Sequence, residues 1–563
     1  MTPALRSRKI AAEEDDAAMR EFGTFDYIIV GAGSAGCVLA NRLTESGRHR
    51  VLLLEAGPAD RNPWIHVPIG YAKLFTNAKV NWLYESEPEP ELNNRRIIQP
   101  RGKVLGGSSS INGLVYIRGQ KEDFDLWRQL GNAGWSWDDV LPYFKKAESQ
   151  QRGADEYHGG DGPLSVSDQT EPHELCEAFI AAGQQTGIPR NDDFNGASQE
   201  GVGYFQTTSR KGLRCSTAVG YLRPARKRPN LTVVTAALTT RILFDGTRAI
   251  GIAFTRGGEP MVARAAGEVI LSAGAINSPQ VLQLSGVGPG GLLRGLGIDI
   301  VREVPGVGAN LQDHFQTRMV FRCSRKITLN DVVANPLRKV GIGLQYALRR
   351  KGPLTISAGY VGAFLRTDPR LVTPDVQVHF LTFSTDKMGT ALHDFPGFSA
   401  SICQLRPESR GSVAIKTAGP GDAPAIRVNY LSTELDRTTM VAGLRLLRKI
   451  SQAPAMAPYV EAELEPGPAC QSDADWLAFC RARGSTIYHP TCTCRMGDDA
   501  TAVVDARLRV RGLDRLRVVD GSIMPNVVSG NTNAAIVMIA EKGAEMILQD
   551  AAAPAGAPAR QYA

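Results

Sequence analysis

The sequence predicts a mixed α/β protein with more than one domain. An apolar run at 25–30 is followed by a glycine-rich turn, a helical pattern and a second apolar run, which is the order of a parallel βαβ unit. The length of 563 residues exceeds what one ordinary hydrophobic core accommodates. The stretches 374–380 and 401–405 alternate apolar and polar residues, which is typical of half-solvated strands in a second sheet.

The glycine-rich turn between the two apolar runs predicts a dinucleotide-binding site. In GAGSAG at 31–36, Gly31 permits the tight turn, Gly33 lets a pyrophosphate approach the backbone, and Gly36 lets helix and strand pack closely. The start of the helix offers free N–H groups to phosphates. Glu55 ends the second strand about 20 residues further on, where an acid accepts hydrogen bonds from ribose hydroxyls. This pattern predicts a Rossmann-like domain for NAD or FAD, and the acid disfavours NADP.

Composition and charge exclude several other classes of protein. The net charge is only +7, and the densest basic run, at 223–228, is typical of a solvated face, so we expect no nucleic-acid partner. No window holds 18 continuous apolar residues, so we expect no transmembrane segment, while peripheral membrane contact stays open. The N-terminus lacks the apolar core of a secretory signal, which favours a cytoplasmic protein. We expect flexible tails at 1–24 and 551–563.

The nine cysteines predict reduced thiols rather than disulfides or a metal centre. Their odd number and their scatter along the chain suit a cytosolic protein. Only Cys492 and Cys494 lie close together, and His489 is the one further metal-binding residue type nearby. A zinc site usually needs four ligands. We therefore expect no metal and interpret both cysteines as small buried residues.

Two further elements rich in small residues predict contact with a large ligand. The stretch 102–113, GKVLGGSSSING, can lie flat against a planar group and point backbone N–H groups at oxygen atoms. The stretch 274–288 follows an apolar strand at 268–272. It indicates a turn and then a helix, with Pro279 in the first turn and glycine at the end.

Together these segments resemble the signatures of the glucose–methanol–choline (GMC) family of flavin oxidoreductases. The two family signatures correspond to 102–116 and 274–288, and the resemblance runs from about residue 25 to about residue 548. It implies that the dinucleotide is FAD rather than NAD. Further segments that resemble the family are 81–82, 305–314, 489–497 and 519–522 with Pro525.

The family architecture implies two interleaved domains. One is a Rossmann-like FAD-binding domain, and the other is a substrate-binding domain on a mostly antiparallel sheet. The strand patterns at 230–235 and 241–244 agree with this architecture. We expect FAD-binding parts at 25–160, 226–320 and 489–550, the last with the active site, and substrate-binding parts at 161–225 and 321–488.

The resemblance also assigns the site residues. His489 corresponds to the active-site histidine of the family, although a single histidine is more often structural when judged from sequence alone. Asn533 stands where the family carries a second His or Asn, and its residue type is equally typical of a helix N-cap. It precedes an apolar helix whose N-terminus favours negative charge on a reduced flavin or an alkoxide. The implied FAD contacts are Gly31, Gly33, Ser34 and Glu55 at the adenosine end, Val233 at the adenine, Gly107, Asn112, Gly113 and Val115 along the flavin, Asp520 and Gly521 at the pyrophosphate and ribityl chain, and Asn531 and Thr532 near the ring.

The activity that the resemblance implies is oxidation of an alcohol to the aldehyde, with His489 taking the hydroxyl proton and the flavin taking the hydride. Some relatives link FAD covalently through a histidine just before the second glycine element. The corresponding stretch here, 98–101, has no histidine, so we expect non-covalent FAD. Phenylalanines between 364 and 398 favour a primary alcohol that is aromatic or medium-chain, although core packing explains them equally well. No acidic cluster lies beside His489 in sequence to favour choline.

The sequence leaves the electron acceptor and two rival functions open. A quinone or another carrier would make the protein a dehydrogenase, which the chain most resembles, and O₂ would make it an oxidase. A non-redox lyase or a light-driven decarboxylase on the same fold is kept open by Cys403 near Arg406 and Arg410. A binding protein that has lost catalysis is the other rival. The presence of His489 and Asn533 argues against the lyase or decarboxylase. The binding protein would require a chain that purifies without flavin, or with flavin that no alcohol reduces.

Overall fold

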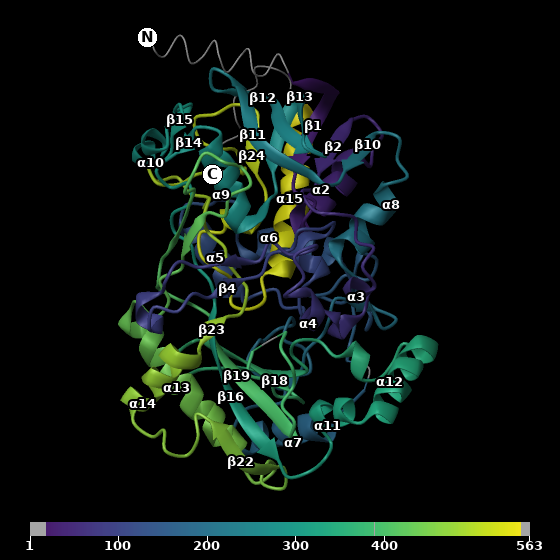
Figure 1. The fold of residues 1–563 in the computed structure, drawn as a ribbon, viewed down its shortest axis with the longest axis vertical. Helices are drawn as coiled ribbons and strands as arrows, with labels where there is room; N and C mark the ends of the chain where they lie inside the picture. The colour runs from purple at the N-terminus through teal and green to yellow at the C-terminus, as the bar shows by residue number, and fades with distance from the viewer. Residues whose placement is uncertain (1–18, 170, 388, 553–563) are drawn as a thin grey trace.

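The computed structural model describes residues 19–552 apart from 170 and 388, and these residues form two main sheets. Figure 1 shows one sheet in the upper half of the view, with β1, β2, β12 and β13, and the other in the lower half, with β16, β18 and β19. The mixed α/β class predicted from the sequence is confirmed. Most of the two predicted tails lies outside the described residues, but β1 already begins at Arg20.

The first sheet contains the predicted βαβ unit at its centre. Its strand order is β10–β2–β1–β13–β12–β11, with β24 beside β13. The strands β10, β2, β1, β13 and β24 pair in parallel, whereas β11, β12 and β13 form an antiparallel extension. The strands are β1 (Arg20–Val30), β2 (Val51–Leu54), β10 (Leu231–Val234), β11 (Ala237–Asp245), β12 (Arg248–Arg256), β13 (Glu259–Leu271) and β24 (Leu516–Val518).

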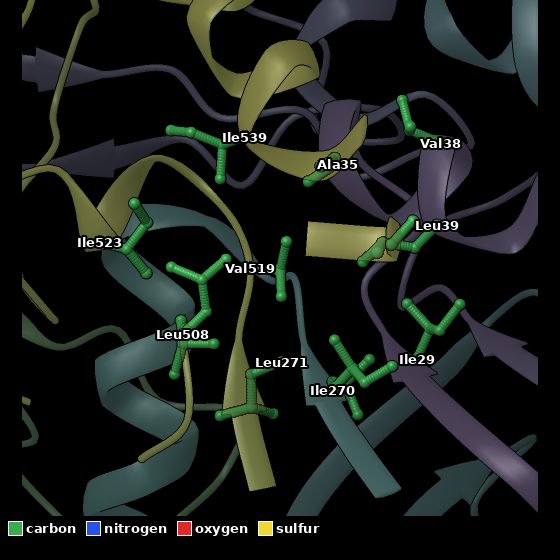
Figure 2. Packing of buried hydrophobic residues seen from close by; sticks show 14 of the residues in the cluster. Ile29, Ala35, Val38, Leu39, Ile270, Leu271, Leu508, Val519, Ile523 and Ile539 are labelled. Atoms are coloured by element: carbon green, nitrogen blue, oxygen red, sulfur yellow. The ribbon is translucent and has the colours of Figure 1, made fainter. Parts of the chain in front are cut away.

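Two helices from opposite ends of the chain cover this sheet. Helix α2 (Ser34–Thr44) leaves directly from the glycine turn, and α15 (Asn533–Ala552) packs against both α2 and α6 (Trp137–Ala147). Figure 2 shows Ile29 and Ile270 of the sheet below the helical side chains Leu39 and Ile539. All of these side chains are buried. This apolar core fixes the glycine turn and the start of α15 relative to each other.

The second sheet is antiparallel and carries its own helices. Its order is β22–β16–β19–β18–β17–β7, with β23 beside β16. Helix α13 (Glu434–Ser451) packs against β19 and α14 (Asp473–Arg483), and α7 (Glu174–Gln185) packs against β7 and β17. The strands are β7 (Gly201–Tyr204), β16 (Phe315–Cys323), β17 (Val361–Leu365), β18 (Val376–Leu381), β19 (Gly397–Gln404), β22 (Val460–Glu465) and β23 (Ser485–Thr486).

The expectation that β18 and β19 are half-solvated is wrong, because every residue of both strands is buried. The apolar residues Val376, Val378 and Phe380 of β18 pack into the core beneath the helices. The alternating polar residues Gln377 and His379 are also buried. Their face of the sheet is covered by the rest of the protein rather than by water. Polar alternation on a buried face is typical of a strand that lines an internal site.

The second signature forms α9 (Gly274–Leu284), and here Pro279 lies inside the helix rather than in its first turn. A proline within a helix leaves the carbonyl four residues earlier without its backbone donor. That carbonyl belongs to Ala275, and it accepts a 2.6 Å hydrogen bond from the hydroxyl of Thr493. The helix can therefore begin earlier than predicted, because a distant side chain supplies the missing donor.

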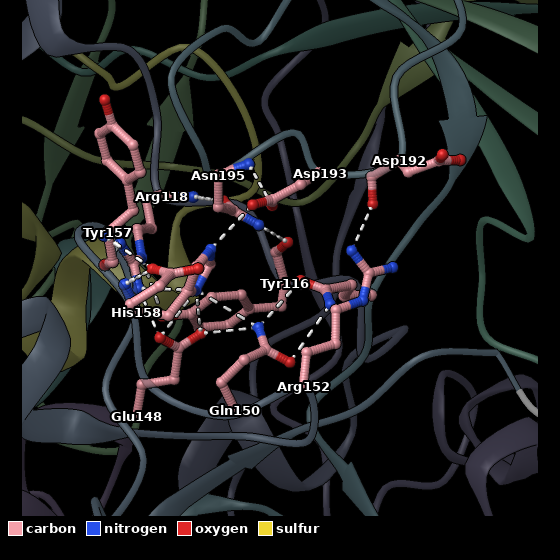
Figure 3. Close-up of polar contacts among 12 residues, drawn as sticks. Tyr116, Arg118, Glu148, Gln150, Arg152, Tyr157, His158, Asp192, Asp193 and Asn195 are labelled. Carbon is pink, nitrogen blue, oxygen red and sulfur yellow. Dashed lines mark hydrogen bonds and ion pairs between the residues drawn. The ribbon is translucent and has the colours of Figure 1, made fainter.

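A buried charged network lies next to the first signature (Figure 3). Arg118 donates to Glu148 at 2.6 Å, and both side chains are fully buried. His158 contacts Glu148 through Nδ1 and Asp193 through Nε2 at 2.8 Å. Burial opposes the charge on His158, but its hydrogen bonds to Asp193 and Glu148 outweigh that effect and raise its pKa to about 9. The network ties the end of the signature to the loops around it.

The remaining elements are short or lie at the surface. Within the part of the chain that the structure describes, no helix is both long enough and apolar enough to cross a membrane. The nine cysteines are free and buried. The other helical segments are α3 (Pro63–His66), η1 (Pro68–Gly70), α4 (Tyr71–Leu74), η2 (Pro90–Leu92), η3 (Gly107–Ser110), α5 (Lys121–Gln129), η4 (Ala218–Leu222), α8 (Arg223–Ala225), α10 (Gly290–Gly295), α11 (Leu329–Ala334), α12 (Pro336–Arg349), η5 (Pro353–Thr355) and η6 (Gly521–Ile523). The other strands are β3 (Tyr84–Glu85), β4 (Ile98–Gln99), β5 (Glu148–Gln150), β6 (Leu164–Val166), β8 (Ser209–Arg210), β9 (Leu213–Arg214), β14 (Val287–Gly288), β15 (Arg302–Glu303), β20 (Ser412–Ala414) and β21 (Ala425–Arg427).

Candidate active site

Two adjoining cavities run from the glycine turn to the second sheet. The first lies over the glycine turn, and the second lies against β18. They share Ser34, Arg101, Ser108 and Ile536 in their walls, so they meet at the start of α2 and of α15. Of the residues predicted for FAD, the first is lined by Gly31, Gly33, Ser34, Glu55, Gly107, Asp520 and Gly521, and the second by Ser34, Asn112, Gly113, Val115, Asn531 and Thr532.

The first cavity fits the pyrophosphate end of FAD because small residues shape it. Gly31 has φ +97°, and a Cβ there would lie 2.6 Å from the carbonyl oxygen of Ser272. At Gly33 the nearest atom to an added Cβ is 3.8 Å away, so this glycine is not required by the protein's own packing. It caps α2, where free N–H groups favour phosphate. A Cβ on Gly107 would lie 2.7 Å from the Cα of Gly33, so the two glycine elements touch.

Two carboxylates in this cavity are held by backbone donors. Glu55 accepts from the N–H groups of Ala32 at 3.0 Å and Gly57 at 2.9 Å. Burial raises the pKa of Glu55 to about 7, although these two hydrogen bonds act to lower it. Asp520 accepts from the N–H of Gly274 at 2.8 Å, which joins the second signature to the segment before η6. The residues of the cavity thus supply backbone donors for phosphates and a carboxylate for ribose hydroxyls.

Val233 is not among the residues that line either cavity. It lies on β10, where it pairs with Leu53 of β2. From the same region, Ala237, Leu238 and Thr239 line the first cavity instead. The chain turns between Val234, the last residue of β10, and Ala237, the first residue of β11. Of these two strands, only β11 reaches the cavity wall.

His489 lies in the wall of the second cavity and is held from two directions. Its backbone N–H donates to the carboxylate of Asp313 at 2.7 Å. That carboxylate is fully buried and also accepts from the hydroxyl of Thr486. The residues on either side are constrained as well, since Tyr488 has φ +73° and Cys492 has φ +75°. Non-glycine residues with a positive φ are uncommon, and they cluster at functional sites.

A chain of hydrogen bonds determines which nitrogen of His489 carries the proton. His314 Nε2 lies 2.9 Å from the carbonyl oxygen of Leu405, which can only accept, so Nε2 of His314 carries hydrogen. Burial lowers the pKa of His314 to about 4, so its ring is neutral and its Nδ1 has a free lone pair. The Nδ1 atoms of His314 and His489 are 2.9 Å apart, so His489 donates from Nδ1. Its Nε2 is then unprotonated and faces Asn531.

In the structure, Asn531 rather than Asn533 hydrogen-bonds His489. Asn531 Nδ2 lies 3.2 Å from His489 Nε2, and its Oδ1 accepts from Gln377 at 3.2 Å. Asn533 instead accepts a 2.8 Å hydrogen bond from the hydroxyl of Ser34, at the junction of the two helices. Both asparagines line the cavity, but only Asn531 hydrogen-bonds His489 in the structure. The two residues are of the same type and two positions apart, so the motif alone did not separate them.

His379 is a second histidine in the wall of this cavity, and it is not among the residues predicted for the site. It lies on β18, is buried, and neither ring nitrogen makes a hydrogen bond of good geometry among the described residues. Burial is the largest cause that lowers its pKa, to about 3. Burial is also the largest cause that lowers the pKa of His489 well below its usual value. The signal in the sequence was the polar alternation of 374–380, which was interpreted as solvent exposure.

The phenylalanines that favoured an aromatic or medium-chain alcohol, and the cysteine that kept a rival chemistry open, lie outside the cavity. None of the phenylalanines at 364, 380, 383, 395 and 398 lines the cavity; for example, Phe398 stacks on Phe321 inside the sheet. Cys403 is fully buried on β19, is not a lining residue, and burial raises the pKa of its thiol. Within the described residues, no cluster of three or more potential ligands could hold a metal ion.

Comparison with known proteins finds the same family at both ends of the chain. Family models described as GMC oxidoreductase match residues 25–316 and 407–540. An alcohol dehydrogenase [acceptor] of Pseudomonas putida is 46% identical over 529 residues, which cover 93% of this chain and 96% of that protein. An oxygen-dependent choline dehydrogenase of Ectopseudomonas mendocina is 47% identical over 530 residues, covering 93% and 94%. The solved structure of pyridoxine 4-oxidase from Mesorbium loti has a TM-score of 0.85 at 32% identity, covering 93% of this chain and 99% of that chain.

Proposed function

Because the chain belongs to the GMC oxidoreductase family, we propose that it oxidises an uncharged primary alcohol, aromatic or medium-chain, to the aldehyde, with His489 as the base and Asn531 as its partner. The family establishes the broader statement: the protein is an FAD-dependent oxidoreductase that acts on CH–OH donors. The observation that carries the finer proposal is the unprotonated Nε2 of His489 facing Asn531 inside the second cavity.

The two side chains complement an alcohol hydroxyl. A hydroxyl group beside them can donate its hydrogen to Nε2 of His489 and accept from Nδ2 of Asn531. Proton transfer to Nε2 produces an imidazolium whose Nδ1–H points at His314, so the positive charge is met by a hydrogen-bond acceptor. Asn531 stays neutral and donates to the alkoxide oxygen as its charge develops.

The reaction removes one proton and one hydride from the alcohol. FAD, when bound, supplies the acceptor of the hydride from the carbon that carries the hydroxyl group. The N-terminus of α15 opens at this cavity, with Asn533 as its first residue, and its dipole favours negative charge there. The alcohol thus becomes the aldehyde, with its proton on His489 and its hydride, which carries both electrons, passed to the cofactor that would be bound there.

The charges of the second cavity support an uncharged substrate over choline. Among the described residues that line it, none is Asp or Glu, whereas Arg101 and Arg318 both contribute. Gln316 and Ser401 are neutral, and the rest of the wall includes Leu114, Val115 and Leu381. A quaternary ammonium group would meet two guanidinium groups without a compensating carboxylate, which is unfavourable in a buried site.

We also propose that electrons pass to a quinone or another carrier rather than to O₂, and that FAD is bound without a covalent link. Similarity to the Pseudomonas putida alcohol dehydrogenase [acceptor] supports the first statement. The absence of histidine from 98–101 supports the second. Denaturing the holoenzyme tests the link directly, because non-covalent FAD is released into the supernatant.

The experiment for the substrate is anaerobic reduction of the flavin in the dark. We expect benzyl alcohol or 1-octanol to bleach the flavin band near 450 nm, about the wavelength typical of this cofactor, and choline to leave it oxidised. Arg318→Gln serves as the charge variant and should not lose activity toward uncharged alcohols. Bleaching by choline and by no uncharged alcohol would contradict the proposed substrate class. Rapid return of the band on admitting air would contradict the proposed acceptor.

A further inference from the structure

Helix α12 presents an apolar face away from the protein. Leu337, Val340, Leu344 and Leu348 are 84%, 70%, 59% and 75% exposed, and their spacing of three and four residues places them on one side of the helix. Tyr346, on the opposite side, is buried and donates to the carbonyl oxygen of Gly212 at 2.9 Å. Figure 1 shows α12 at the edge of the lower half of the molecule, beside α11.

Basic residues surround this apolar face, and no acid balances them. From 332 to 367 the chain contains no Asp or Glu. Within residues 19–552, apart from 170 and 388, none of the five cations at the two ends of α12 makes an ion pair with a carboxylate. These cations are Arg338, Lys339, Arg349, Arg350 and Lys351, and all of them are exposed.

We propose that α12 docks on the surface of a membrane that contains anionic phospholipid, with its leucines in the interface and its cations at the phosphates. A helix with leucines on one face and Lys or Arg beside them lies in the plane of a bilayer surface. Each basic residue near an anionic surface strengthens the attraction to it. A second copy of the chain fits less well, because a twofold contact would bring the two sets of five cations together.

The helix also lies close in sequence to the second cavity. Nine residues after the end of α12, the N–H of Ala358 donates to the carbonyl oxygen of Gly113 at 3.0 Å, and both residues line that cavity. Docking would therefore hold this wall near the bilayer, where apolar alcohols and lipid-soluble carriers concentrate. The docking itself does not depend on which alcohol is the substrate.

Flotation of the holoenzyme with vesicles tests the proposal. We expect the holoenzyme to float with vesicles of phosphatidylglycerol and phosphatidylcholine at low salt. It should not float with vesicles of pure phosphatidylcholine, and high salt should release it from the anionic vesicles. Leu344→Ser combined with Leu348→Ser should lower the bound fraction at least about tenfold. Because both side chains are exposed, the variant should keep its flavin and its rate of flavin reduction by alcohol.

A matched control is Leu371→Ser combined with Val372→Ser, an exposed apolar pair outside α12, which should bind vesicles like the unaltered protein. Absence of the unaltered holoenzyme from the anionic vesicles would overturn the proposal, and so would equal binding by the α12 variant. Concentration-dependent dimerisation that the α12 variant abolishes, without vesicle binding, would show instead that a second copy covers this face.

Discussion

The Nδ1 atoms of His314 and His489 lie 2.9 Å apart, and the carbonyl of Leu405 on the far side of His314 decides which of them carries hydrogen. A carbonyl can only accept, so His314 donates to Leu405 from Nε2 and accepts from Nδ1 of His489. Nε2 of His489 is left as a base facing the cavity. His314, which does not line the cavity, thus selects the tautomer of His489, which does.

His314 is accordingly predicted to be a positioning residue. His314→Leu removes the acceptor for Nδ1–H of His489, and we expect the limiting rate of flavin reduction to fall about 10- to 100-fold. His314→Asn restores an acceptor oxygen near the position of Nδ1 and should recover much of the rate. Equal FAD content in all three proteins separates this role from a structural one. Equal rates in the leucine and asparagine variants would show that the tautomer does not matter.

The pH dependence of kcat/KM follows from the same contacts. Only the neutral form of His489 accepts a proton, and burial lowers its pKa well below the usual 6.5. The acid limb should therefore lie below pH 6.5, and kcat/KM should be level from there through neutral pH. Initial rates between pH 5 and pH 8 test this expectation. A limb centred above 6.5 would mean that the base is not held in this environment.

The two asparagines should differ in their effect on catalysis. Asn531→Ala removes the donor beside Nε2 of His489, and we expect flavin reduction to slow about 10- to 100-fold. Asn533→Ala loses a hydrogen bond to Ser34 instead, so it should change FAD retention more than the reduction rate. Stopped-flow absorbance on protein reloaded with FAD separates the two effects. A larger loss of rate in the Asn533 variant would restore the original assignment.

Substitutions at Gly33 and Gly31 should separate an effect on FAD binding from an effect on folding. Gly33→Ala places its Cβ no closer than 3.8 Å to the protein, so the chain should fold, but the methyl group blocks the approach of the pyrophosphate. We expect FAD affinity to fall about tenfold or more, with the melting temperature of the apoprotein unchanged. Gly31→Ala should lower that melting temperature, because its Cβ would meet the Ser272 carbonyl at 2.6 Å at a φ of +97°. The reverse ranking in the two assays would contradict this division of roles.

Stability should also depend on His158. Its folded pKa is raised to about 9, so the stability that it contributes is complete below about 6.5 and is lost as the pH rises toward 9. His158→Gln keeps a side chain that hydrogen-bonds but cannot gain charge. In this variant the free energy of unfolding should therefore fall less between pH 6.5 and pH 9. Urea unfolding of FAD-saturated protein at pH 6.5, 8 and 9 measures it. An identical alkaline slope in the variant would place the titrating group elsewhere.

The parts of the fold that the sequence revealed are those set by local patterns. The turn at 31–36, Glu55 and the helix after Pro279 are each specified by neighbours within a few residues, and their positions follow from backbone geometry and burial. Even there, the start of α9 was missed, since the donor that replaces the lost backbone bond comes from Thr493, more than 200 residues away.

The site itself required the three-dimensional structure. His314, His379 and His489 come from three segments, and nothing local indicates that two of their rings share a hydrogen bond. The alternation in β18 was visible, but a strand facing water and a strand facing an internal cavity produce the same pattern. Asn531 and Asn533 are indistinguishable by residue type until a structure shows which one reaches His489.

The rate of anaerobic flavin reduction in His489→Ala tests the central claim most directly. The variant should purify with FAD, because its side chain lies in the second cavity, away from the glycine turn. With a saturating alcohol that bleaches the unaltered enzyme, we predict a limiting rate lower by about 100- to 10,000-fold, the range typical for loss of a general base. A fully loaded variant that bleaches within about threefold of the unaltered rate would contradict the assignment of His489 as the base.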